Sequence, residues 1–440
     1  MRNPNKPLFT VTLAVLAAAC MWYYMRGIVI PQQEKYAAQL DIPRGNLSDL
    51  YPRWLGAREL LLHGRDPYSR EITLEIQRGY YGREIDPARP YDPRDEQGFA
   101  YPVYVVFLLA PTVHMDFMTV RLLFFWLLIG CTVCSVLFWM QVVGVGFLPW
   151  TTLAVVLLVL GSYSFAEALS QQQPLLLVAL LLAAAFWARQ RGRLFLSGVL
   201  LAVATIKPQV ALLPVILMLL WVLGGWRERR RWLWGFVVTM LLLLGAAEYV
   251  LPGWMFRFYA AVRAYSRYMA GTSFLDRLVG PCWSLIAGVI IVLPVLSACW
   301  KSRVEGAGTM ASRRALCLAL VAVVCLAPTL AIYNQVLLLP GLLLVFDLVF
   351  DQRQALPHAR VAVRYLGKLT VALLAWPWVA CVSLVVVKVV FHAESLVHWA
   401  WQAPLYTTLA LPVALFAFLL LLPSAAVSSQ QTSPTSEILA

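Results

Sequence analysis

Long apolar runs separated by short polar turns make up most of the chain. A helix needs about 20 apolar residues to cross roughly 30 Å of hydrocarbon. We take twelve runs as candidates for full spans: residues 8–25, 118–142, 147–163, 174–187, 194–206, 210–223, 232–250, 281–300, 315–331, 336–350, 369–390 and 404–422. The pattern predicts an all-α polytopic membrane protein with about twelve transmembrane helices in one domain, residues 1–423.

Two segments depart from this pattern. Residues 26–98 are polar, but Leu50, Trp54, Ala57 and Leu61 recur at helical spacing before Gly64. They predict a helix that lies in the membrane interface, within a long first loop. Residues 100–115 are apolar but short and contain two prolines. We expect a re-entrant segment there, since irregular backbone is tolerated at membrane depth only inside protein.

Composition supports a membrane protein. The chain has 440 residues, of which 61% are hydrophobic and 13% charged, with a mean hydropathy of +0.73. A soluble domain is about 45–50% apolar and about 25% charged. We expect the first run to remain as an uncleaved span, because no small-residue cleavage site follows it.

The net charge of +13 is concentrated in four turns, residues 189–193, 227–231, 301–314 and 353–368. Residues 26–98 are nearly balanced, with eleven Lys and Arg against twelve Asp and Glu. Basic turns between spans stay in the cytoplasm, so we expect a plasma (inner) membrane protein and no nucleic-acid partner. Both termini are then cytoplasmic, and residues 424–440 form a disordered tail rich in Ser, Thr and Gln. The outer face receives residues 26–98, 170–173, 207–209, 251–280, 332–335 and 392–403.

Metal and redox sites have weak signals. The eight cysteines lie in or beside apolar runs, and the Cys131-x-x-Cys134 spacing has no second ligand pair nearby. We expect ordinary core thiols without disulfides. The clustered acids of residues 92–96 suit a divalent cation or a solvated loop, and we favour the loop. We therefore predict no metal and no cofactor.

Several motifs, in order along the chain, resemble glycosyltransferase family 87. Residues 49–68 (DLYPRWLGARELLLHGRDPY) resemble its first-loop signature, which begins with Asp and ends in Asp/Asn-Pro-Tyr. FAYP at 99–102 resembles a Phe-x-Tyr-Pro block, with Val103 where a second Pro is usual. QQQPLLL at 171–177 resembles a Gly-Gln block whose Gly is replaced here by Ser170 or Gln171, and 191–208 resembles a basic turn, a Gly-containing helix and a Lys-Pro ending.

A late block, PTLAIYNQVLLLP at 328–340, also fits the family. The mannosyltransferase branch carries a His pair where this chain has Tyr333 and Asn334, which leaves the sugar open. The resemblance implies a C-type glycosyltransferase fold and transfer of a hexose, mannose by default, from a polyprenyl-phosphate carrier. The acceptor is then a cell-envelope glycan or glycolipid at the outer membrane face.

The same resemblance singles out Asp49 as the catalytic group. As a general base it would take the acceptor's proton, and one base suffices for an inverting displacement. Asp49 also stands where a helix is expected to start, so a helix N-cap shared with Ser48 is the structural alternative.

Other residues are candidates for substrate contacts. Lys207, Arg263 and Arg267 are expected to bind the donor phosphate, with contact to bulk lipid headgroups as the alternative. Hydroxyl and amide side chains of the family motifs are expected to contact substrate: Tyr51, Tyr68, Tyr101, Gln171, Gln172, Tyr333, Asn334 and Gln335.

The rival interpretation is a transporter or a flippase of lipid-linked sugars. Such proteins usually show internal repeats and charges in the middle of the membrane. Here the polar segments gather on one expected face and no repeat of fixed period is visible. A purely structural assembly subunit has no positive signal.

Overall fold

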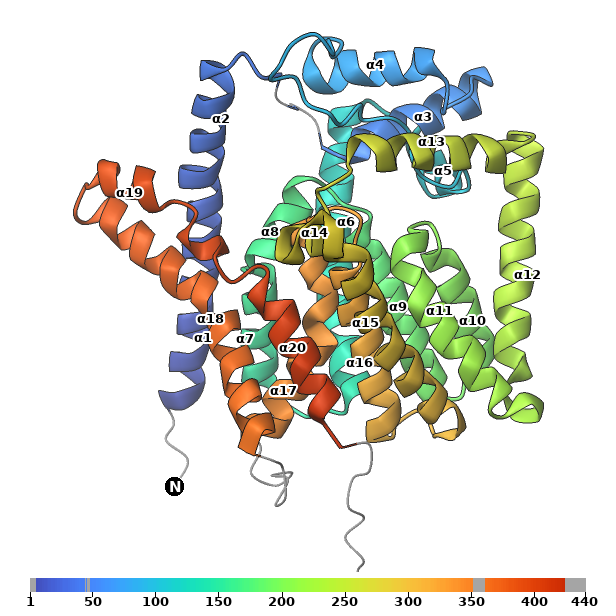
Figure 1. Cartoon of the computed structure of the whole chain (residues 1–440), viewed down its shortest axis with the longest axis vertical. Helices are drawn as coiled ribbons and strands as arrows, with labels where there is room; N and C mark the ends of the chain where they lie inside the picture. The colour runs from blue at the N-terminus through green and yellow to red at the C-terminus, as the bar shows by residue number, and fades with distance from the viewer. Residues whose placement is uncertain (1–4, 44, 46–47, 351–360, 424–440) are drawn as a thin grey trace, which may run out of the picture.

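The computed structural model describes residues 5–43, 45, 48–350 and 361–423, and helices are the regular elements of this part (Figure 1). Seven helices in it are long and apolar enough to cross a membrane: Pro7–Gln39, Phe117–Val143, Trp226–Val250, Pro281–Val304, Ile332–Phe350, Val361–Val389 and Glu394–Leu421. A bent pair, Pro149–Leu160 with Tyr163–Ser170, makes eight if it counts as one span. The prediction of an all-α multi-pass membrane protein is confirmed.

The expected number of about twelve full spans is not confirmed. Four of the predicted spans are the short helices α9 (Leu175–Gln190), α10 (Leu194–Ala204), α11 (Pro208–Leu223) and α16 (Met310–Cys325), of 16, 11, 16 and 16 residues. At 1.5 Å per residue, 16 residues reach only about 24 Å. α9 and α16 are also largely buried by neighbouring helices, which is a reason to be apolar besides contact with lipid.

The N-terminal helix is longer than predicted. α1 (Asn5–Tyr24) continues through a π-helical turn (Met25–Val29) into α2 (Ile30–Gln39). We expected the first span to end at residue 25 and polar loop to follow. The polar residues of α2 instead extend the helix beyond the body of the molecule (Figure 1).

Residues 100–115, predicted as a re-entrant segment, contain no long helix. They form only α5 (Val105–Leu109) and a short 3-10 turn (Ala110–Thr112). The indole N–H of Trp54, on α3 (Leu50–His63), donates a hydrogen bond to the Thr112 carbonyl at 3.2 Å. The irregular backbone is thus satisfied by protein, as a re-entrant segment requires.

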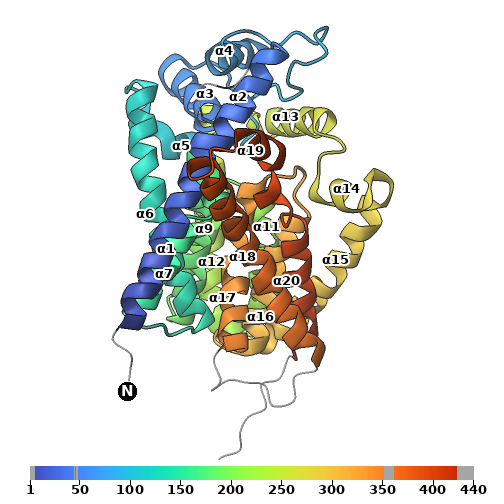
Figure 2. The ribbon, with the colours of Figure 1, turned by 90° about the vertical axis from the view of Figure 1, so that its left-hand side faces the viewer.

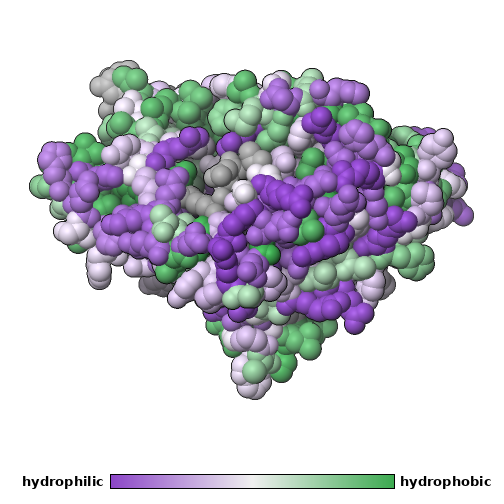
Figure 3. Space-filling view, turned by 90° about the horizontal axis from the view of Figure 1, so that it is seen from above, coloured by the Kyte–Doolittle hydropathy of each residue, from purple (hydrophilic) through white to green (hydrophobic). Residues whose placement is uncertain are grey.

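The two ends of the helical body differ. α3, α4 (Arg70–Tyr81) and α13 (Trp254–Tyr268) lie at one end, which we call the loop end, and α14 (Phe274–Val279) lies below α13 (Figures 1 and 2). Seen from there, the surface is largely hydrophilic (Figure 3).

Three of the four basic turns meet at the opposite end, which we call the basic end. Gln190 donates to the Ala307 carbonyl at 3.5 Å, and Arg229 donates to the Arg303 carbonyl at 2.5 Å. The fourth turn lies partly outside the described residues, as does the predicted tail 424–440. The described basic turns therefore share one side of the molecule, as predicted.

Close glycine contacts join α10 to α12 (Trp226–Val250). A Cβ on Gly198 would lie 2.2 Å from the Trp232 carbonyl oxygen, and one on Gly235 would lie 2.1 Å from that of Phe195. Small residues let membrane helices approach closely. This contact fixes α10, whose C-terminal end carries the turn that contains Lys207.

Candidate active site

Asp49 lies at the start of α3 but does not cap it. It occupies the N-cap position with φ −60° and ψ −9°, and its side chain makes no capping hydrogen bond. The carboxylate instead accepts from two neutral donors, the Tyr80 hydroxyl at 3.2 Å and the Gln173 side-chain amide. These donors orient the carboxylate without neutralising its charge.

The turn that joins α8 (Tyr163–Ser170) to α9 holds the start of α3 in place. The backbone N–H of Asp49 donates to the Gln171 carbonyl at 3.0 Å. The Ser48 hydroxyl donates to Oε1 of Gln172 at 2.6 Å. Gln172 is buried and has φ +49°, a left-handed conformation that is uncommon for a residue with a side chain. Ser48 and Gln172, which are 124 positions apart, are thus held together. Backbone strain such as that of Gln172 concentrates at functional sites.

Arg53 lies one helical turn after Asp49, on the same face of α3. Its guanidinium donates to the Asp49 carbonyl and lies 4.5 Å from the centre of the Tyr101 ring. Burial disfavours the charged guanidinium, but the Tyr101 oxygen and the Asp49 carboxylate outweigh it and raise the pKa of Arg53. Arg53 therefore stays cationic beside the carboxylate.

Lys207 reaches the same cluster from the turn between α10 and α11. It is 5% exposed, and its ammonium lies 5.1 Å from the centre of the Tyr333 ring. Within the described part of the chain, no oxygen accepts a hydrogen bond from this ammonium. A buried charge without such a partner is costly, so the position suits a cation that binds an anionic ligand.

Tyr101 is the residue that the two cations share. Burial acts to raise the pKa of its phenol, but Lys207 and Arg53 outweigh burial and lower that pKa below its ordinary value. The Tyr68 hydroxyl donates to the Tyr101 carbonyl at 2.6 Å and so fixes the backbone behind the ring. Tyr68 thus supports the cluster through Tyr101.

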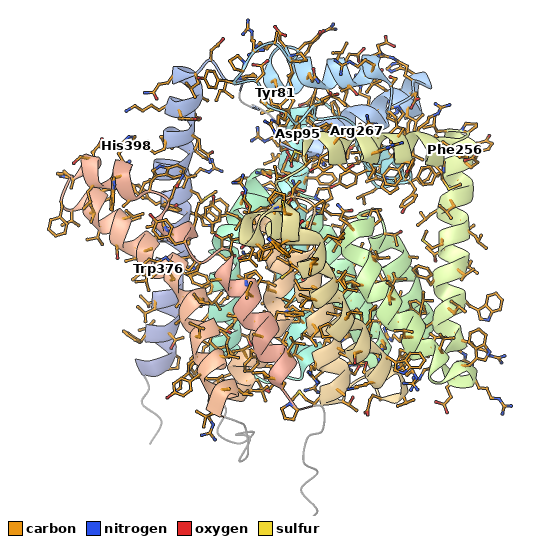
Figure 4. All side chains as sticks on the ribbon, viewed as in Figure 1. Tyr81, Asp95, Phe256, Arg267, Trp376 and His398 are labelled. Carbon is orange, nitrogen blue, oxygen red and sulfur yellow. The ribbon has the colours of Figure 1, made fainter. Side chains whose placement is uncertain are left out.

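A loop and α13 add groups above the cluster. Tyr81 donates to the Asp95 carbonyl at 2.9 Å, and Figure 4 shows Asp95 beside the end of α13 that carries Arg267, with Tyr81 above it. Burial, reinforced by the charge of Asp49, raises the pKa of Asp95. Burial likewise raises the pKa of Tyr265, on α13, to about 12. From below, α8 contributes Glu167, one of whose carboxylate oxygens is buried without a hydrogen-bond partner among the described residues.

The remaining predicted residues are arranged differently. Tyr51 packs its ring against Trp54 and Phe117 at 6.0 and 5.0 Å. Gln335 donates to the Thr408 carbonyl at 2.7 Å, and Asn334 is buried next to Tyr333.

The two arginines predicted to bind phosphate, Arg263 and Arg267, are exposed on α13. Their side chains form no hydrogen bond or ion pair within the described residues. Of the three basic residues predicted for the donor, only Lys207 reaches the cluster around Asp49.

Two of the three acidic residues at 92–96 form ion pairs with arginines. Asp92 pairs with Arg83 at 2.6 Å, and Glu96 pairs with Arg70 at 3.0 Å. In the part of the chain that the structure describes, no three His, Cys, Asp or Glu side chains gather as metal ligands. All eight cysteines are free.

Sequence reasoning did not assign roles to Arg53, Tyr80, Asp95 and Glu167. Arg53 had a usable signal, since residues four apart on a helix share a face. Tyr80 had none: it lies 31 residues after Asp49, and only the packing of α4 against α3 brings it to the carboxylate.

Comparison with known protein families gives a match over about half of the chain. Residues 99–329 match glycosyltransferase family 87. No curated protein and no solved structure gives a significant match to the chain.

Proposed function

Since the chain belongs to glycosyltransferase family 87, we propose that this membrane glycosyltransferase moves a hexose from a polyprenyl-phosphate carrier to a glycan or glycolipid acceptor. One observation carries the proposal. An oriented carboxylate, Asp49, shares a cluster with Lys207, a buried ammonium that donates no hydrogen bond to a described oxygen. These are the two charges that transfer from a phosphate ester needs: one to take a proton and one to hold the phosphate.

Asp49 is the general base in this proposal. It takes the proton of the acceptor hydroxyl as that oxygen bonds to the anomeric carbon, and the bond from this carbon to the phosphate oxygen breaks. Positioned bases typically contribute about 10²–10⁴-fold in rate. Because the acceptor oxygen attacks the anomeric carbon in a single displacement, the configuration at this carbon inverts.

Lys207 and Arg53 hold the leaving phosphate. The electron pair of the broken bond stays on the polyprenyl phosphate, which gains negative charge as it leaves. Fixed cations at that point stabilise the transition state more than the ground state. Arg53 is held by the Asp49 carbonyl and the Tyr101 ring, so it needs little reorganisation.

An apolar cavity provides a place for the isoprenoid tail. It has a volume of about 720 Å³ and lies between α1, α7 (Pro149–Leu160), α17 (Leu339–Phe350), α18 (Val361–Val389) and α20 (Ala410–Leu421). Ile332 and Gln335 line it, and the two residues between them are Tyr333, beside Lys207, and Asn334. A lipid with its phosphate at Lys207 can therefore lay its tail in this cavity.

Sugar hydroxyls need hydrogen-bonding groups close to these charges. Tyr101, Tyr333, Asn334, Gln171 and Gln172 supply such groups in or beside the cluster. We propose mannose as the sugar on the family resemblance alone. We propose that the reaction takes place at the outer face of the plasma membrane, and the position of the basic turns at the end away from Asp49 supports this orientation.

A transfer assay tests the function and separates it from a transporter. The purified protein in detergent is incubated with labelled polyprenyl-phosphate hexoses and a mixture of glycan and glycolipid acceptors. Transfer without a sealed membrane supports the enzyme, and the labelled product identifies sugar and acceptor. Movement of the carrier across vesicles with no transfer to any acceptor would support the flippase instead.

A further inference from the structure

A cavity at the basic end lies outside the proposed reaction. It has a volume of about 630 Å³ and opens between α15 (Pro281–Lys301), the start of α16 and the end of α20. These helix ends lie at the end of the molecule away from α3 and α4 (Figure 1). Its ligand is therefore distinct from the substrate bound near Asp49.

Charges of both signs line this cavity. Lys301, Arg314 and Glu305 all contribute to the wall. Within the described residues, neither Lys301 nor Glu305 forms an ion pair. Arg314 is fixed, because its guanidinium donates to the carbonyls of Leu419 and Leu420 at 2.7 Å each. One cavity thus presents two cations and a separate carboxylate.

The start of α16 adds to the positive side. Thr309 caps this 16-residue helix by accepting from the Ser312 N–H at 3.3 Å. Met310 and Ala311 line the cavity. The first backbone N–H groups of a helix have no hydrogen-bond partner within the helix itself. The helix dipole favours an anion at this point.

The surroundings indicate that the ligand is a lipid. The outer face of α15 exposes Ile290, Leu293 and Trp300. Arg303 lies 3.9 Å over the Trp300 ring, and exposed tryptophans with basic neighbours mark the headgroup level of a bilayer. Acyl chains along α15 would place a headgroup at the cavity.

We propose that this cavity binds an aminophospholipid, the phosphate at Lys301, Arg314 and the start of α16, and the ammonium at Glu305. Basic pockets between membrane helices are known to bind phospholipid headgroups. The unpaired Glu305 adds selectivity, because a primary ammonium donates hydrogen bonds that a quaternary one lacks. An anionic headgroup without an amine leaves Glu305 unpaired. The site binds phosphatidylethanolamine in preference to phosphatidylcholine and phosphatidylglycerol.

Native mass spectrometry of the full chain released from detergent measures lipid retention. Wild type is compared with Lys301→Gln, Glu305→Gln and, as a matched control, Lys368→Gln. Lys368 is also exposed near the basic end but does not line the cavity. Lys301→Gln should lower phosphatidylethanolamine binding about tenfold or more, the usual effect of one lost charge-assisted contact. Glu305→Gln should remove the preference over phosphatidylcholine, and Lys368→Gln should change neither.

Three results would overturn the proposal. If Lys301→Gln and Lys368→Gln lowered phosphatidylethanolamine binding equally, the lipid would be held by general attraction between headgroups and basic residues. Equal binding of all three lipids by wild type would mean that Glu305 does not select. Displacement of the lipid by inorganic phosphate alone would mean a site for free phosphate. Folding of each variant is checked by its melting temperature in the same detergent.

Discussion

Lys207 and Arg229 are both cations beside an aromatic ring, but they are held in different ways. Arg229, at the basic end, lies 4.3 Å over the Trp221 ring and donates to the carbonyls of Trp221 and Arg303 at 2.7 and 2.5 Å. Lys207, in the Asp49 cluster, lies 5.1 Å from the Tyr333 ring and donates no hydrogen bond to a described oxygen. The first cation ties two turns together, whereas the second is available to a ligand.

The same difference extends to the carboxylates. Asp92 and Glu96 each pair with an arginine. Asp49 instead accepts from a hydroxyl and an amide, which are neutral donors. Asp92 and Glu96 are thus fixed by arginines, whereas Asp49 is oriented by neutral donors, as the proposed base requires.

The largest effect is expected from Asp49→Asn. The amide keeps the size of the side chain but cannot take a proton, so transfer should fall by about 10²–10⁴-fold. Stability should change little, because the carboxylate does not cap α3. Initial transfer rates at equal protein concentration measure the effect. Asp66→Asn, which alters a first-loop aspartate paired with Arg257 at 2.7 Å, is the control and should remain active. If Asp49→Asn were as active as wild type, Asp49 would be excluded as the base.

Lys207→Gln should weaken use of the donor. Loss of a charge-assisted contact to phosphate typically costs about 1.5–3 kcal/mol, or about 10- to 150-fold. The apparent KM for the lipid donor and the transfer rate measure this loss. Unchanged kinetics would mean that Lys207 contacts bulk lipid headgroups and not the substrate.

Arg229→Gln tests the other half of the comparison. It removes a guanidinium that donates to carbonyls of two turns, so stability should fall by about 1.5–3 kcal/mol. The KM for the donor should stay the same. Thermal unfolding in detergent and donor kinetics check both statements, and a raised KM at an unchanged melting temperature would contradict the structural role.

The smallest effect is expected from Tyr80→Phe. It removes one neutral hydrogen bond to Asp49, worth about 0.5–1.5 kcal/mol, so the rate should fall about 2- to 12-fold. A loss as large as that of Asp49→Asn would show that Tyr80 takes part in the chemistry itself. No change at all would mean that Gln173 alone orients the carboxylate.

The loop-end cluster was partly predictable from sequence. The basic turns placed residues 170–173, 207–209 and 332–335 on the side of the first loop, and the structure brings these three segments to Asp49. The last predicted segment, residues 392–403, does not join them: His398 meets Gln32 on α2 at 2.8 Å. Charge patterns report the side of the membrane but not the position on that side.

Other features could not be predicted for physical reasons. Short buried helices such as α9 are as apolar as true spans, so hydropathy alone does not give their length. Tyr80 and Asp95 reach Asp49 through tertiary packing, and the pattern of their own segments does not indicate that partner. Arg263 and Arg267 share a helical face, but nothing in their spacing indicates that this face is exposed.

Binding of labelled polyprenyl phosphate, measured beside transfer, tests the central claim most directly. The account assigns proton removal to Asp49 and phosphate binding to Lys207. Asp49→Asn should bind the lipid phosphate as wild type does while transfer is lost, and Lys207→Gln should bind it about 10- to 150-fold more weakly. Wild-type binding by Lys207→Gln, or loss of both binding and transfer in a folded Asp49→Asn protein, would contradict this division of roles.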